Sequence, residues 1–101
     1  PQAVFESLPR MVNTPEIRLD CPDEIKFSVV ERFTKYARGR YQDCLDIDGV
    51  RFEDGGSWGL VRPSNTQPVI VLRFEAADAG KLEKIKSEAM EKLEEIIRTM
   101  Q

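Results

Sequence analysis

The chain has 101 residues, of which 15 are basic, 18 are acidic and none is histidine, for a net charge of −3. This length fits one domain, because domains usually contain about 100–150 residues. The 41% hydrophobic content suffices for one modest core and is too high for a disordered chain. The acidic balance argues against broad, nonspecific binding to nucleic acid or acidic membranes. The absence of histidine removes the commonest general acid/base and the commonest transition-metal ligand.

The two cysteines, Cys21 and Cys44, lack the paired spacing of a zinc site. We expect reduced, half-buried thiols in a cytoplasmic protein. A single disulfide between them is the alternative and would need an oxidising compartment. No segment approaches the roughly 20 apolar residues of a membrane span, and the first residues lack the pattern of a secretory signal. The chain does not begin with methionine, which suggests a processed chain or an excised piece of a longer one.

The first part of the chain predicts a strand followed by a helix. Residues 1–13 are interrupted by proline and are expected to form a lead-in, whereas residues 16–20 alternate polar and apolar as a half-buried strand does. Residues 21–24, Cys-Pro-Asp-Glu, are typical of a helix start, because proline is tolerated in the first turn and carboxylates favour the positive end of the helix dipole. Gly39 can end this helix. Its predicted apolar stripe consists of Phe27, Val30, Phe33 and Ala37.

Turn signals divide the middle of the chain into short strands. Asp48-Gly49 predicts a hairpin, because both residues of such a turn need positive φ. Residues 54–57 form a second predicted turn. The strand-like runs around these turns are residues 44–47, 50–52, 58–61 and 69–74, and the last run is β-branched, continuous and bounded by proline.

The chain closes with a long amphipathic helix that begins near Asp78, a good N-cap. The element order is then strand, helix, three mostly antiparallel strands, helix. Because each helix has a single apolar stripe to bury, we expect both helices to cover one face of a four-stranded sheet, an α+β fold. The apolar face of the last helix consists of Leu82, Ile85, Ala89, Leu93, Ile96, Ile97 and Met100.

The most distinctive chemistry lies in the loop Arg62-Pro63-Ser64-Asn65-Thr66-Gln67-Pro68. Arg62 supplies a permanently charged planar fork that suits phosphate or carboxylate. Ser64, Asn65 and Thr66 add hydroxyl and amide donors, and such short residues let backbone N–H groups form an anion nest. Because donors dominate and the loop has no carboxylate, phosphate is the best-fitting ligand. The alternative is an ordinary polar turn whose serine and threonine cap their own backbone.

Three segments resemble the C-terminal domain of the α-D-phosphohexomutases, and most closely the phosphomannomutase/phosphoglucomutase branch. They are Asp48-Gly49-Val50-Arg51-Phe52, Trp58-Gly59-Leu60-Val61 with the loop to Pro68, and Val71-Leu72-Arg73-Phe74-Glu75-Ala76. The loop matches the R-[PA]-S-N-T-x-P pattern of that branch. Asn65 is the discriminating residue, since the phosphoglucosamine and phosphoacetylglucosamine branches usually have Ser-Gly-Thr there. Residues 14–17 and 21–23 also resemble the start of this domain, so the resemblance covers nearly the whole chain.

The resemblance implies one domain of a four-domain enzyme that reversibly transfers phosphoryl between C1 and C6 of a hexose phosphate. In that family a phosphoserine in the first domain donates phosphoryl, an aspartate-rich loop in the second holds Mg2+, and the third reads sugar hydroxyls. Neither the serine motif nor the metal loop occurs here, and we expect Asp46, Asp48 and Asp54 to be solvated turn residues. We therefore expect no catalytic residue, metal or cofactor in this chain, Mg2+ in the parent enzyme, and no activity from the isolated chain.

By the same resemblance, residues 1–13 would be an interdomain lead-in or hinge, and residues 14–101 the C-terminal phosphate-binding domain. Its fold would be similar to that of the TATA-box-binding protein. The expected partners are mannose or glucose 1- or 6-phosphate, the bisphosphate intermediate and the remaining three domains of the parent enzyme, with no nucleic acid and no membrane. The substrate phosphate would be bound by Arg62, Pro63, Ser64, Asn65 and Thr66, with Pro63 shaping the loop.

Other features have competing interpretations. We expect Arg73 to pair with a strand carboxylate such as Glu53 or Glu75, although it could face the phosphate. We expect Trp58 to cover the sheet rather than to stack on a ligand. A rival function is a free-standing α/β binding module, for example for RNA, since a four-stranded sheet with two helices is also an RNA-reading shape. A basic cluster near the end of the first predicted helix would favour RNA binding, but cations are also favourable near a helix C-terminus, which explains the cluster without RNA. The cluster consists of Arg32, Lys35, Arg38 and Arg40.

Overall fold

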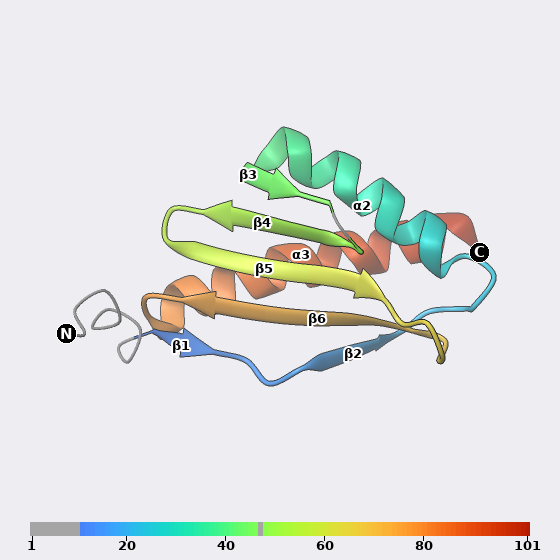
Figure 1. Ribbon diagram of the computed structural model, residues 1–101, viewed down its shortest axis with the longest axis horizontal. Helices are drawn as coiled ribbons and strands as arrows, with labels where there is room; N and C mark the ends of the chain where they lie inside the picture. The colour runs from blue at the N-terminus through green and yellow to red at the C-terminus, as the bar shows by residue number, and fades with distance from the viewer. Residues whose placement is uncertain (1–10, 47) are drawn as a thin grey trace.

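The computed structural model describes residues 11–46 and 48–101 (Figure 1). The predicted strand at 16–20, the strands around both turns and the two helices are all present. Of the predicted lead-in 1–13, residues 1–10 lie outside the described residues. The elements are β1 (Val12–Asn13), β2 (Ile17–Asp20), α2 (Lys26–Arg40), β3 (Gln42–Leu45), β4 (Val50–Asp54), β5 (Ser57–Pro63), β6 (Val69–Ala76) and α3 (Ala79–Met100).

All strands pair antiparallel in one sheet, in the order β1-β6-β5-β4-β3, and β2 also pairs with β6. The predicted α+β class is confirmed, but the prediction of four strands is wrong, because the sheet has six strands among the described residues. β1, which has two residues, is an additional strand, whereas β3 overlaps the predicted run at 44–47 but lies at 42–45 and has a shifted register with β4. A strand as short as β1 does not show the alternating pattern from which a strand is predicted.

β1 and β2 lie along the same edge of β6, as the lower edge of the sheet in Figure 1 shows. Thr14, which lies between them, is buried and takes the place of a strand residue. Its N–H donates to the Phe74 carbonyl at 3.0 Å, and its hydroxyl oxygen accepts from the Phe74 N–H at 3.1 Å. The sheet therefore begins at Val12, within the segment expected to be a lead-in.

Both predicted turns are present, and both depend on positive φ. Asp48 and Gly49 have φ of 56° and 126°, and a Cβ on Gly49 would lie 2.4 Å from the Val61 carbonyl oxygen, so only glycine fits there. β3 ends at Leu45, however, so the connection to β4 is longer than the Asp-Gly pair alone. The second turn is the tighter one: Gly55 and Gly56 have φ of 57° and 91° between paired strand ends.

Helix α2 begins later than the sequence predicts. Residues 23–25 form a turn in which the Ile25 N–H donates to the Pro22 carbonyl at 3.1 Å, and the helix starts at Lys26. Phe27 is wrongly placed in the predicted stripe, because 58% of it is exposed. The helix also continues past Gly39 to Arg40. Its buried face consists of Lys26, Val29, Val30, Phe33, Thr34 and Ala37.

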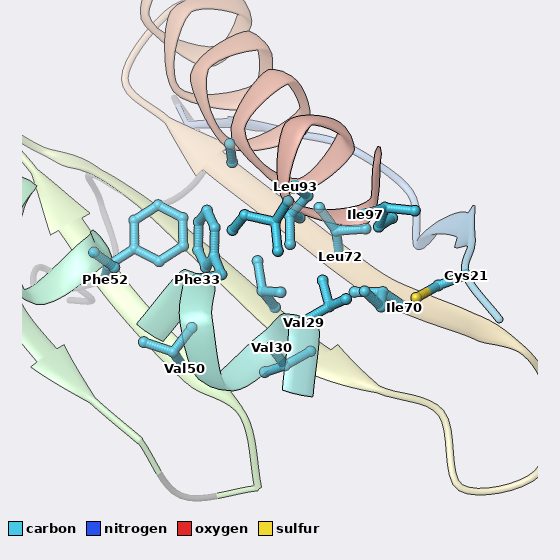
Figure 2. Packing of buried hydrophobic residues seen from close by; sticks show 14 of the residues in the cluster. Cys21, Val29, Val30, Phe33, Val50, Phe52, Ile70, Leu72, Leu93 and Ile97 are labelled. Atoms are coloured by element: carbon cyan, nitrogen blue, oxygen red, sulfur yellow. The ribbon is translucent and has the colours of Figure 1, made fainter. Parts of the chain in front are cut away.

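Both helices bury their apolar faces against the same side of the sheet. α2 packs over β3, β4 and β5, α3 packs over β5, β6 and β1, and the helices contact each other. Figure 2 shows Phe33 of α2 beside Phe52 of β4, with ring centroids 5.5 Å apart, and Leu72 and Leu93 close by. The predicted apolar face of α3 is confirmed, since Ile85, Ala89, Leu93, Ile96 and Ile97 are buried.

Helix α3 is held at its start and in its middle by specific hydrogen bonds. The Asp78 carboxylate accepts from the Lys81 N–H at 2.8 Å, which confirms the predicted N-cap. The Tyr41 hydroxyl donates to Glu88 at 3.0 Å and ties the start of β3 to α3. Burial and this hydrogen bond raise the pKa of Tyr41, so the phenol remains neutral over the physiological range.

Cys21 is a free, buried thiol, so it forms no disulfide with the half-buried Cys44. Burial raises the pKa of Cys21, and the nearby Lys26 offsets part of this effect. None of the described helices is long and apolar enough to span a membrane.

Gly59 makes room for two buried phenylalanine rings of the neighbouring strands. It pairs with Phe52 on β4 and with Phe74 on β6, and a Cβ there would lie 2.6 Å and 2.8 Å from atoms of these buried rings. We expect Gly59→Ala to lower the free energy of unfolding by about 1–3 kcal/mol, because the rings must shift within a packed core. The midpoint of urea unfolding measures this.

Gly39→Ala is the matched control, since a Cβ there would meet no atom within 4 Å and the residue lies inside α2. We expect it to stabilise the domain by about 0.5–1 kcal/mol through higher helix propensity. A Gly59→Ala variant that unfolds at or above the urea concentration of the parent chain would contradict this account of the core.

Candidate functional site

The loop singled out in the sequence connects β5 to β6 at one end of the sheet, at the right of Figure 1. Arg62 and Pro63 belong to the end of β5, where they pair with Val71 and Ile70. The connection itself comprises residues 64–68. The arginine is therefore presented from a strand in the middle of the sheet, whereas the neutral donors follow it on the turn.

Ser64 organises the loop from within. It is only 7% exposed, and its hydroxyl oxygen accepts from the backbone N–H groups of Thr66 at 3.2 Å and Gln67 at 3.1 Å. Its own N–H donates to the Val69 carbonyl at 3.0 Å. Three of the loop's N–H groups are thus already bonded. Pro68 has no N–H, so among the described contacts of the loop the Asn65 N–H is the one backbone donor still available to an anion.

A buried lysine, which sequence reasoning missed, fastens the loop to helix α2. Lys26 is 3% exposed, and its Nζ donates to the Gln67 carbonyl at 2.9 Å and lies 2.7 Å from an Asp23 carboxylate oxygen. The Cys21 N–H donates to the Pro68 carbonyl at 2.9 Å. The turn before α2 and the loop therefore form one bonded unit.

The sequence did contain a signal for Lys26. It precedes Val29, Val30 and Phe33 by three, four and seven residues, the spacing that places side chains on one helix face. Lysine is rarely buried, so a pattern built on apolar residues passes over it. Inside the helix face it is satisfied by one carboxylate and one carbonyl.

A cavity of about 930 Å³ opens beside the loop, between α2, the β3–β4 connection and the end of β5. Of the five predicted site residues, Arg62, Pro63 and Asn65 line this cavity, whereas Ser64 and Thr66 do not. Ser64 lies beneath the loop, and Thr66 is exposed. The other lining residues are Phe27, Ser28, Val30, Glu31, Thr34, Lys35 and Arg38 of α2, with Asp46, Asp48 and Gly49.

The cavity is lined by both basic and acidic side chains. Arg38 is paired with Asp46. In the part of the chain that the structure describes, Arg62 makes no ion pair. The loop itself has no carboxylate, although Glu31 and Asp48 also line the cavity, and Gly49, the residue after Asp48, packs against Arg62. The side formed by Arg62 and Asn65 is therefore the part suited to an anion.

Arg73 and Trp58 lie on the sheet face opposite the helices. Arg73 is exposed and forms no ion pair among the described residues, so the expected pair with Glu53 or Glu75 is absent. Glu53 is instead bonded by Arg51 at 2.8 Å, and the Arg51 guanidinium lies 4.7 Å from the centroid of the Trp58 ring. Arg73 does not line the cavity. Trp58 is half-buried against the sheet, as expected.

An RNA-binding sheet of the kind considered above needs exposed aromatic residues on its central strands and a basic face, and the described residues do not provide this combination. Phe52 and Phe74 are buried under the helices instead of exposed on the open face. Two members of the basic cluster are neutralised, since Arg38 pairs with Asp46 and Arg40 lies 3.1 Å from Glu88. Among the side chains that the structure describes, no group of three or more from acidic, cysteine or histidine residues is arranged to hold a metal ion.

Comparisons with known proteins agree on one family. The family described as "Phosphoglucomutase/phosphomannomutase, C-terminal domain" matches residues 16–92. The chain is 45% identical over 83 residues to a phosphomannomutase/phosphoglucomutase of Pseudomonas putida, covering 82% of this chain and 18% of the relative. It is 34% identical over 91 residues to a phosphoglucomutase of Neisseria gonorrhoeae, covering 86% of this chain and 19% of the relative.

A solved structure shows the same likeness in three dimensions. The crystal structure of a phosphoglucomutase/phosphomannomutase family protein from Burkholderia thailandensis superposes with a TM-score of 0.71 at 33% identity. The match covers 95% of this chain and 20% of the other. The chain thus spans about a fifth of the length of these proteins.

The role of Lys26 can be tested by Lys26→Met, which keeps the length of the side chain and removes its charge. Because the Gln67 carbonyl then loses its donor, we expect the free energy of unfolding to fall by about 1–3 kcal/mol. We also expect faster hydrogen exchange at the amides of Cys21 and Ser64, which bond within the same unit. Lys35→Met, at an exposed position of the same helix, is the control and should change neither quantity. Unchanged exchange in Lys26→Met would contradict the fastening role.

Proposed function

This chain belongs to the family of phosphoglucomutase/phosphomannomutase C-terminal domains, and we propose that it anchors the phosphate that is not being transferred while a hexose phosphate exchanges phosphoryl between C1 and C6. The observation that carries the proposal is the position of Arg62 and Asn65. Both line a cavity large enough for a sugar phosphate, on a loop that carries no carboxylate, and Arg62 has no ion pair in the described region. The chain covers about a fifth of the length of its relatives, so the activity of a whole mutase is proposed for the longer enzyme of which this domain would be a part.

The loop residues take different parts in the proposed site. The Arg62 guanidinium donates two parallel N–H groups to phosphate oxygens. The Asn65 amide and backbone N–H supply neutral donors from the cavity wall, and the Thr66 hydroxyl, which is exposed but does not line the cavity, would donate from the outer side of the loop. Pro63 and the buried Ser64 act mainly by shaping the loop, since Ser64 accepts from two of its backbone N–H groups. A loop held in its binding shape loses little conformational entropy when the ligand arrives.

The reaction proposed for the parent enzyme explains why a site that binds phosphate without recognising particular sugar hydroxyls is suitable. After the first transfer, a bisphosphorylated sugar must turn over and present its other end to the catalytic serine of another domain. Either end of the sugar is then docked on this domain. Donors that respond to charge and to the tetrahedral shape of phosphate accept both orientations, whereas hydrogen bonds to particular hydroxyls would favour one.

The parent enzyme is proposed to use Mg2+, which would stabilise charge on the transferred phosphoryl group. The carboxylates described in this chain do not fit such an ion, since no three of them come together. The metal, the phosphoserine and the sugar-reading loop would therefore belong to the other three domains. A cytoplasmic location is part of the same proposal.

The proposal predicts weak, loop-specific binding of inorganic phosphate by this chain. One charge-assisted contact contributes ~1.5–3 kcal/mol, so we expect a Kd on the order of millimolar. In an NMR titration, amide shifts should centre on residues 62–66, and Arg62→Ala should weaken binding about 10-fold or more.

Arg73→Ala is the matched control, because Arg73 is also a strand arginine but lies outside the cavity. It should leave the phosphate affinity unchanged. If Arg62→Ala binds phosphate as well as the parent chain, the proposed role of Arg62 is wrong.

We further expect the 101-residue chain to have no mutase activity with glucose 1-phosphate or mannose 1-phosphate, even with Mg2+ and a hexose bisphosphate present. The reason is that its sequence lacks both the serine motif and the aspartate-rich metal loop. A coupled assay on highly purified chain measures this. Turnover that persists when the chain is prepared from a mutase-deficient host would overturn the expectation.

A further inference from the structure

Phe27 is an aromatic residue without a place in the core. It is 58% exposed on the first turn of α2, and among the described residues it shares this large exposure with only one other large apolar side chain, Leu45. The two differ in position, because Phe27 lines the cavity and Leu45 does not. A large ring exposed to water in an open cavity carries a solvation cost that ligand contact would remove.

The Phe27 ring and the loop of residues 64–68 both contact Lys26. The Nζ of Lys26 lies 5.4 Å from the centroid of the Phe27 ring and 2.9 Å from the Gln67 carbonyl oxygen. One buried ammonium therefore contacts both the aromatic ring and the loop that presents Asn65. The ring and the proposed phosphate donors face one cavity from neighbouring, mutually bonded segments.

We propose that Phe27 contacts the sugar itself, packing against the C–H face of the hexose whose phosphate is held by Arg62 and Asn65. This inference rests on the proposed function. The face of an aromatic ring is electronegative, and the C–H groups of a pyranose are weakly electropositive, so the two surfaces attract while excluding water. The loop's own donors offer no comparable apolar surface.

A contact of this type suits a sugar that docks in two orientations. Packing against C–H groups does not require a particular hydroxyl to face a particular donor. It therefore adds affinity for a hexose phosphate over inorganic phosphate without selecting which end is bound. Phe27 would make the site prefer sugar phosphates as a class while leaving the choice of sugar to other parts of the enzyme.

The test compares two probes, inorganic phosphate and glucose 1-phosphate, by NMR titration of the folded chain. We expect the parent chain to bind glucose 1-phosphate about 2- to 10-fold more tightly than phosphate, and Phe27→Leu to abolish this margin with the phosphate affinity unchanged. Phe27→Tyr should retain the margin, because it keeps the ring. Leu45→Ala, at the other exposed apolar residue, should also retain it.

The outcomes separate this inference from the proposed function. If Phe27→Leu keeps the margin, or weakens both probes equally, the ring does not contact the sugar and the inference is overturned, even though Arg62→Ala still weakens both probes. If Arg62→Ala leaves both affinities unchanged, or if neither probe binds the parent chain, the phosphate-anchoring function fails and this inference fails with it. A margin that disappears only in Phe27→Leu supports the inference.

Discussion

The ammonium group of Lys26 is the interaction on which the shape of the site depends. A buried charge is costly unless it is paired and hydrogen-bonded, and here one carboxylate and one backbone carbonyl satisfy it. Those two partners come from the turn before α2 and from the loop after β5, which are 44 residues apart when counted from Asp23 to Gln67. If the loop moves away from the helix start, Lys26 keeps its ion pair with Asp23, but the buried ammonium and the Gln67 carbonyl lose their hydrogen bond. Arg62, Asn65 and Phe27 consequently line one cavity.

The loop shows that a self-capped polar turn and a ligand-binding turn are compatible. Ser64 uses its hydroxyl to hold the N–H groups of Thr66 and Gln67, as an ordinary turn does. Arg62 and Asn65 are neighbours of these bonded residues and line the cavity. Internal bonding therefore supplies rigidity, and the residues left over supply chemistry. This division lets a chain with a net charge of −3 present a local site for an anion.

The elements with strong local signals were predictable. The continuous apolar run of β6, the Asp78 cap and apolar face of α3, and the glycine turns at 48–49 and 55–56 all match the sequence pattern, because each depends on neighbouring residues. β1 was not predicted, since two paired residues leave no periodic trace, and β3 lies at 42–45 rather than at the predicted 44–47, with a shifted register against β4. Those strands exist because β6 and β4 offer them partners.

The candidate site divides in the same way. The donor residues of the loop were recognisable from composition and family pattern, but the residues of α2 that pack around the loop were not. Lys26 was missed because its burial depends on a carbonyl far along the chain. Phe27 was misplaced because the buried face of α2 includes Lys26, the residue before it, and leaves the Phe27 side chain exposed. Local pattern therefore located the chemistry, whereas tertiary contacts determined its geometry.

The irregular edges of the sheet have a consequence for self-association. An outer strand with a straight row of free N–H and C=O groups invites a second chain to add to it. Here the outer strand β3 changes register between Gln42 and Leu45 and is flanked by α2, and on the other side β6 is covered by two short strands interrupted at Thr14. Neither edge offers a long, regular template, so the domain resists strand addition between copies and the growth of fibrils from its sheet.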